Sequence, residues 1–173
     1  SFFDVGRRAV VRWRDGHASI ASEWADGAVD GVIRFFPGEW LHNLPSQCDP
    51  VRFFRGATTP VSNPGAALLT QSKRFPLVWD GLRTDLPTWR AFLPATHDPR
   101  EVPWRDGDSW VLKPALGRVG EDIGIAGVTE LKEWRRIRRS VRWFPGHWVA
   151  QERFQPTPLV VAGETFHPCI GVY

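Results

Sequence analysis

The sequence predicts an α/β fold in which mixed and antiparallel strands form two lobes with flanking helices. Three observations predict it. Short apolar segments typical of strands alternate with stretches of helical periodicity along the 173 residues. Hydrophobic residues make up 42% of the chain, which is enough for a packed core. A charged, turn-rich segment at 98–108 predicts a connection between the lobes, which we place at 1–108 and 109–173.

The first lobe begins with strands. Residues 9–14 predict a strand, and Asp15-Gly16 is a hairpin-turn pair. Residues 31–36 predict another strand, which Pro37-Gly38 ends. The helical elements expected in this lobe are a turn at 39–44, a helix at 65–74 that ends near Lys73, and a short helix at 87–92.

The second lobe begins with the apolar strand 109–112, which is followed directly by Lys113. A loop with four glycines, 117–127, surrounds a short strand at 123–125. Thr129 is expected to cap a helix. One face of that helix is apolar and carries Leu131, Trp134, Ile137 and Val141. The remaining elements are a strand at 148–154 and further strands between 159 and 173.

Composition disfavours several classes of protein. The net charge of +3 is weak for a nucleic-acid binder. We expect the arginine cluster at 135–142 to be a solvated helix face, with nucleic-acid binding as the alternative. No apolar run approaches the ~20 residues of a membrane span. Cys48 and Cys169 lie far apart and in no metal-ligand spacing, which favours a reducing compartment, so we expect a cytoplasmic protein.

The most informative stretch runs from Trp110 to Asp122. Lysine is scarce in this chain, with three among the 22 basic residues, and Lys113 directly follows an apolar strand. A compact ammonium group in that place can bind phosphate. The glycines of 117–120 would let the backbone approach an anion, and Arg118 could neutralise a transferring phosphoryl group. The alternatives are a solvent-exposed lysine and an ordinary hairpin, and neither a P-loop nor a Rossmann fingerprint is present.

Gln151-Glu152 is a candidate site for the edge of an adenine ring. Backbone groups of a strand that links two lobes can pair with the amino group and a ring nitrogen of a purine. The alternative interpretation is a plain edge strand whose polar side chains point outward.

Four stretches, in this order along the chain, carry a resemblance to a known family: 30–41, 72–79, 110–122 and 149–156. The most specific is the third, Lys113-Pro114-Ala115-Leu116-Gly117-Arg118-Val119-Gly120. In these stretches the chain resembles the ATP-grasp domain of the glutathionylspermidine synthase family, whose grasp is circularly permuted. It departs from the family's pattern at Ser72, Leu112 and Asp122.

The resemblance implies roles for seven residues. Lys73 and Lys113 would hold ATP phosphates. Gly117, Gly120 and the catalytic Arg118 would cover those phosphates, and Gln151 and Glu152 would lie beside adenine. The implied enzyme is an ATP-dependent carboxylate–amine ligase that acts through an acyl phosphate. Its expected partners are ATP, a small carboxylate and an amine of a glutathione- or polyamine-like kind, without nucleic acid or membrane.

The family also uses Mg²⁺, whose ligands lie upstream in an Arg-x-Asp and a Glu-x-Asn pattern that this sequence lacks. We therefore expect Mg²⁺ in the full-length protein and no turnover by this chain alone. The chain would then be a fragment whose ATP-grasp lobe is incomplete at its C-terminus. The alternative is a catalytically incomplete pseudo-ligase or binding module.

Overall fold

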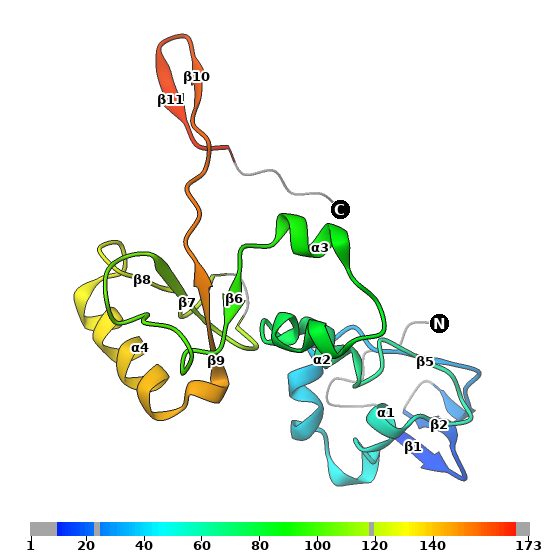
Figure 1. Cartoon of the computed structure of the whole chain (residues 1–173). Helices are drawn as coiled ribbons and strands as arrows, with labels where there is room; N and C mark the ends of the chain where they lie inside the picture. The colour runs from blue at the N-terminus through cyan, green and yellow to red at the C-terminus, as the bar shows by residue number, and fades with distance from the viewer. Residues whose placement is uncertain (1–9, 23–24, 118–119, 169–173) are drawn as a thin grey trace. The chain divides into compact units, whose positions relative to one another are not determined.

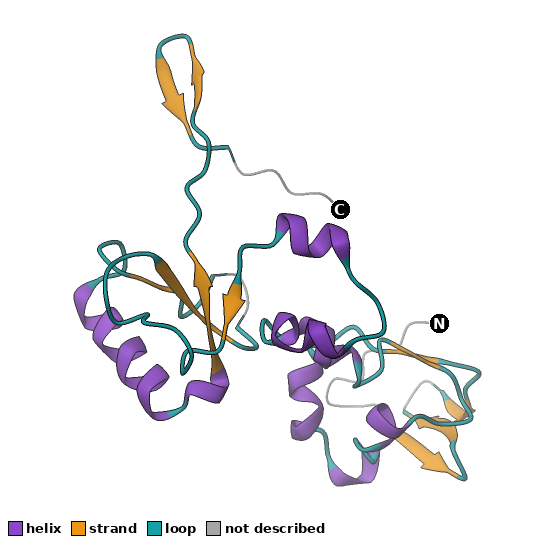
Figure 2. Ribbon diagram, viewed as in Figure 1, coloured by secondary structure: helices purple, strands orange, loops and turns teal. Residues whose placement is uncertain are grey.

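The structure is a computed structural model, and it describes residues 10–22, 25–117 and 120–168. It is a mixed α/β chain with several small sheets and short helices (Figures 1 and 2). The chain divides into two compact units, residues 1–72 and 73–173. The division falls at 72 and not at the predicted 108, because strand β6 (Thr96–His97) pairs with β9 (Trp148–Glu152) inside the second unit.

The first unit contains a three-stranded antiparallel sheet of β1 (Val10–Arg14), β2 (His17–Ala21) and β3 (Asp26–Ala28). The predicted hairpin turn is confirmed. Asp15 and Gly16 both have positive φ, 50° and 81°, as a type I′ turn requires. Gly16 is also needed for space, because a Cβ there would lie 2.6 Å from Oγ1 of Thr58.

Two short strands and four helical segments follow in the described part of the first unit. The strands β4 (Val32–Ile33) and β5 (Val61–Ser62) pair in parallel. Strand β4 is shorter than the predicted strand 31–36, because its partner β5 ends at Asn63, where φ is 56°. The predicted turn at 39–44 is confirmed as η1. The helical segments are η1 (Gly38–Asn43), η2 (Ser46–Cys48), α1 (Arg52–Arg55) and α2 (Ala67–Gln71).

The second unit is built on a four-stranded antiparallel sheet in the order β6-β9-β7-β8, with β7 at Trp110–Pro114 and β8 at Gly124–Ile125. Helix α4 (Leu131–Trp143) covers one face of this sheet (Figure 1). The core between them comprises Trp104, Leu112, Ile137, Val141, Trp148 and Ala150. Because side chains alternate along strands, Lys113 and Gln151 project from the opposite face.

Helix α4 differs from its prediction at its beginning. Thr129 does not cap it, because its hydroxyl accepts the N–H of Ile125 at 2.8 Å and donates to the carbonyl of Ile123. Thr129 therefore closes the preceding turn, and Glu130 is the residue before the first helical turn. Of the predicted apolar face, Ile137 and Val141 are buried, whereas Leu131 is exposed.

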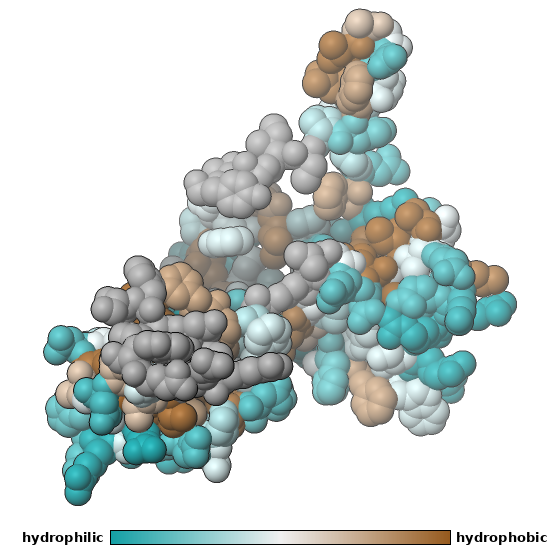
Figure 3. Space-filling view, turned by 180° about the vertical axis from the view of Figure 1, so that it is seen from behind, coloured by the Kyte–Doolittle hydropathy of each residue, from teal (hydrophilic) through white to brown (hydrophobic). Residues whose placement is uncertain are grey.

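The remaining elements of this unit are η3 (Phe75–Gly81), α3 (Pro87–Phe92), η4 (Pro145–His147), β10 (Leu159–Val161) and β11 (Glu164–Phe166). Helix α3 has the bounds that the sequence predicts. Strands β10 and β11 form a hairpin at the end of an extended segment, and its surface is largely apolar (Figure 3).

Close packing of α4 on β8 requires a glycine at position 124. A Cβ there would lie 2.8 Å from the ring of Trp134 and 2.9 Å from Cγ2 of Ile137. We expect Gly124→Ala to lower the free energy of unfolding by about 2 kcal/mol, since overpacking forces neighbours out of place. Urea denaturation measures this change. The matched control is Gly146→Ala, which meets no atom within 4 Å and should have little effect; equal effects would contradict the packing argument.

Candidate functional site

Two lysines that are 40 residues apart in the sequence lie close together in the second unit. Lys113 belongs to β7. The backbone N–H of Lys73 donates to the carbonyl of Ala115 at 2.8 Å, which fixes residue 73 beside the end of that strand. The Nζ of Lys73 donates to the carbonyl of Gly117. The structure therefore brings together three of the predicted site residues, Lys73, Lys113 and Gly117.

Gln151 lies beside Lys113 on the neighbouring strand. The Nζ of Lys113 donates to Oε1 of Gln151 at 2.5 Å, and Nε2 of Gln151 donates to Oγ1 of Thr96 at 2.9 Å. The carbonyl of Pro94 accepts from the same nitrogen at 3.4 Å. These bonds span three strands or strand ends and hold a buried amide in one orientation. Gln151 is thus a fourth predicted site residue in the cluster.

The charged form of each lysine is disfavoured by its surroundings. Burial lowers the pKa of Lys73. Burial also lowers the pKa of Lys113, and the nearby charge of Lys73 lowers it further. Among the described residues no carboxylate forms an ion pair with either lysine, and their hydrogen-bond partners are a carbonyl and an amide oxygen. Each ammonium has three N–H donors, so both retain donors for a further ligand. This donor set fits a polyphosphate.

The glycine loop begins beside the lysines. A Cβ at Gly117 would lie 2.3 Å from Cγ of Pro114, so only glycine fits at this bend. Gly120 has a φ of 80°, a left-handed conformation that side chains disfavour. Arg118, the predicted catalytic residue, lies outside the described residues. The carbonyl of Gly117 already accepts from Lys73, so the start of the loop is tied to the lysine pair.

Glu152 does not join the cluster. Its side chain is exposed, and its backbone N–H donates to the carbonyl of Ala95 at 2.8 Å. Strand β9 lies between β6 and β7, so it is not a plain edge strand. Because its neighbours on both sides use the strand's hydrogen-bonding groups, the N–H of Glu152 is not free to pair with a purine.

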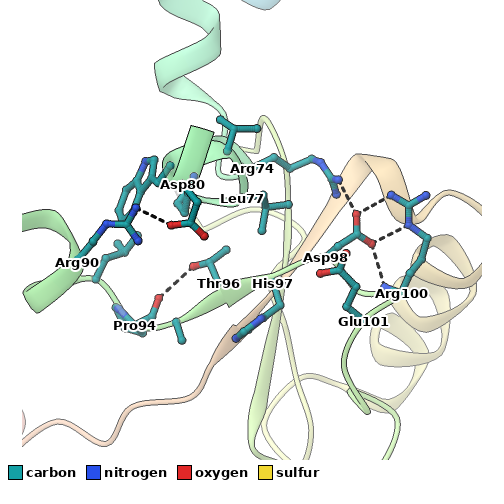
Figure 4. Close-up of a pocket in the computed structure, with 15 residues that line it drawn as sticks. Arg74, Leu77, Asp80, Arg90, Pro94, Thr96, His97, Asp98, Arg100 and Glu101 are labelled. Carbon is teal, nitrogen blue, oxygen red and sulfur yellow. Dashed lines mark hydrogen bonds and ion pairs between the residues drawn. The ribbon is translucent and has the colours of Figure 1, made fainter. Parts of the chain in front are cut away.

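A hollow of about 650 Å³ lies next to this cluster in the same unit (Figure 4). Residues 76–79 and 93–95 supply apolar wall, and Thr96 connects the hollow to Gln151. An ion pair between Arg90 and Asp80, 2.8 Å long, lies at one side. At the other side Asp98 lies between Arg74 and Arg100. The charged lining is therefore largely neutralised by internal ion pairs.

Asp98 is the residue of this region that the sequence did not single out. Its carboxylate is buried and accepts from Arg74 at 2.6 Å, from the guanidinium of Arg100 at 2.7 and 2.8 Å, and from the backbone N–H of Arg100. The hydrogen bonds from Arg100 are the largest cause that holds the pKa of Asp98 well below its usual range; burial opposes them. The first residue of the charged segment 98–108 is therefore buried and ion-paired within the second unit.

The sequence offered one signal for this ion-pair cluster. Asp98 and Arg100 are two residues apart around Pro99, a spacing that allows a carboxylate to accept from the backbone N–H two residues on. Arg74, however, comes from a segment 24 residues away, and nothing in the local pattern links it to Asp98.

No protein-family model, curated protein or solved structure matches this chain. Within the described ranges, no helix is long and apolar enough to cross a membrane. In that same part of the chain, no three or more His, Cys, Asp and Glu side chains are grouped so that they could hold a metal ion, and we assign no residue to Mg²⁺.

Proposed function

We propose that this chain binds the triphosphate of ATP and is the ATP-binding part of an ATP-dependent carboxylate–amine ligase, similar to glutathionylspermidine synthases. The observation that carries the proposal is the convergence of Lys73 and Lys113, both partly desolvated and without a carboxylate partner among the described residues. Where two such ammonium groups have only neutral partners, their charged forms are disfavoured. A polyanion between them would lower the free-energy cost of keeping both lysines charged.

The residues of the cluster have separate tasks in this proposal. Lys113 and Lys73 supply positive charge and N–H donors to the phosphate oxygens. Gln151 orients Lys113, because its amide is itself fixed by Thr96. Gly117 and Gly120 allow the backbone to bend close to the anion. The chemistry implied for the complete enzyme is phosphoryl transfer to a carboxylate and attack by an amine, in which the protein contributes mainly position and charge.

Thermal or chemical unfolding in the presence of nucleotide tests this proposal. A ligand that binds only the folded chain stabilises it by about 2.7 kcal/mol at ~100 times its dissociation constant. We expect ATP to give such a shift, measured with and without Mg²⁺. Lys132→Ala is the control, because Lys132 is exposed on α4, outside this cluster, and should leave the shift intact. The absence of any shift at millimolar ATP would contradict the proposal.

A further inference from the structure

The outward face of α4 carries a concentration of positive charge that the net charge conceals. Between Trp134 and Gln151 the sequence contains five arginines and no aspartate or glutamate. The same stretch contains Trp143, Phe144 and Trp148. Whether such a segment is a solvated face or a binding surface depends on which arginines are already used within the fold.

The structure separates the five arginines into two groups. Arg136 is used internally, because its guanidinium donates to Asp122 and Glu133. Arg138 lies over the ring of Trp134, with its Cζ 5.9 Å from the ring centroid. The others are exposed and form no ion pair with any described carboxylate: Arg135, Arg139 and Arg142. The carboxylates of Asp122 and Glu133 pair with Arg136 instead.

Arg135, Arg139, Arg142 and Trp143, which we call the α4 stripe, share one side of the helix. At about 100° per residue they span an arc of about 100°, opposite Ile137 and Val141. The rise is about 6 Å between Arg135 and Arg139 and about 4.5 Å between Arg139 and Arg142. A row of guanidinium groups at this spacing can follow a linear chain of phosphates.

Exposed aromatic rings lie at the C-terminal end of the α4 stripe. Trp143 is 68% exposed and Phe144 is 60% exposed. The ring of Phe144 stacks on that of His147, with centroids 6.0 Å apart and planes at 26°. Flat rings left in water beside phosphate-binding arginines are the combination by which proteins bind single-stranded nucleic acid, since each base offers a face for stacking.

We infer that the α4 stripe, extended by Phe144, binds single-stranded nucleic acid, with its arginines on phosphates and its rings against bases. An anionic membrane is disfavoured, because the apolar side of α4 is already buried against the sheet: Ile137 and Val141 are 0% and 1% exposed. A helix that inserts into a membrane needs that side free. The inference differs from the expectation drawn from net charge alone, and it is independent of the lysine cluster.

Fluorescence anisotropy with a fluorescein-labelled oligouridylate of about 20 nucleotides tests the inference, with oligothymidylate as the second probe. We expect the full chain to bind at low salt. Replacing Arg135, Arg139 and Arg142 with glutamine should make the dependence of log K on log salt less steep by roughly 2, since each phosphate contact contributes about 0.7. Trp143→Ala should weaken binding roughly tenfold through lost stacking.

A control with the same change in charge replaces Arg12, Arg14 and Arg83, which are exposed and lie outside α4, with glutamine. This variant should retain most of the binding and the salt slope. Circular dichroism confirms the fold of each variant. Failure of the chain to bind either oligonucleotide, equal losses in both triple variants, or binding to phosphatidylserine vesicles without binding to oligonucleotide would overturn the inference. Retained oligonucleotide binding in Lys113→Ala would separate this surface from the proposed ATP site.

Discussion

Replacing Asp98 with alanine should lower the free energy of unfolding of this protein by about 3 kcal/mol. The carboxylate is 6% exposed and is shared by two arginines, of which Arg74 is 26% exposed and Arg100 is 64% exposed. Removing it takes away a charged acceptor 2.6 Å from Arg74 and the acceptor of the backbone N–H of Arg100. It also removes the acceptor that joins residue 74 to β6, close to Lys73.

Urea denaturation at neutral pH measures the Asp98 effect. The matched control is Asp80→Ala, because Asp80 also pairs with an arginine but its carboxylate is 95% exposed. Exposed pairs contribute about 0–1 kcal/mol. A loss in Asp98→Ala no larger than that in Asp80→Ala would show that the buried cluster does not stabilise the fold.

The contribution of Asp98 should depend on pH in the acidic range. Its pKa is depressed in the folded chain, so the folded state binds the proton less tightly than the unfolded state does. The stabilisation is therefore present above the unfolded pKa of about 4 and is lost as pH falls below it. The difference in unfolding free energy between the native chain and Asp98→Asn should be constant from about pH 5 to 7 and shrink below about pH 4.

Lys113→Met should abolish the stabilisation by ATP, a loss of about 2.7 kcal/mol at a ligand concentration ~100 times the original dissociation constant. Methionine keeps the length and apolar stem of the side chain and removes its charge. Gln151→Glu provides a second, sharper variant, since it leaves Lys113 in place and gives it a carboxylate partner that repels phosphate. We expect Gln151→Glu to weaken nucleotide binding at least roughly tenfold, because like charges at close range are costly.

The pH dependence of nucleotide binding follows from the same lysines. Their pKa values are lowered in the free chain, and a triphosphate would raise them again. Binding should therefore take up protons in alkaline solution, and affinity should fall as pH rises through the lysine pKa of the free chain. Calorimetric titrations in buffers of different ionisation enthalpy measure this uptake. An affinity that is unchanged into the alkaline range would show that these ammonium groups do not contact the ligand.

The sequence predicted elements whose signals are local. The type I′ turn at Asp15-Gly16 and helix α3 follow from turn chemistry and proline placement, and the structure confirms them. Strand β9 forms over 148–152 of the predicted 148–154. Thr129 shows the limit of this reasoning, because a residue suited to cap a helix instead bonds to Ile125 in the preceding turn. Both outcomes satisfy the hydroxyl, and only the tertiary path of the chain decides between them.

The part of the candidate site that local sequence signals place was predictable, and the part that depends on long-range pairing was not. Lys113 and Gly117 are placed by one strand and the bend after it, which the sequence shows directly. The link to Gln151 depends on strand pairing at long range. The position of Asp98 and the internal place of β9 in the sheet also depend on long-range pairing, because β6 pairs with β9, a strand far along the chain. No local pattern contains that information.

The most direct test of the account is the structure of this chain with a non-hydrolysable ATP analogue. We predict phosphate oxygens within about 3 Å of the Nζ atoms of both Lys73 and Lys113. Lys113 should still be oriented by Gln151 in that complex. A triphosphate bound elsewhere, or one that leaves either ammonium group with only its present carbonyl or amide partner, would contradict the account.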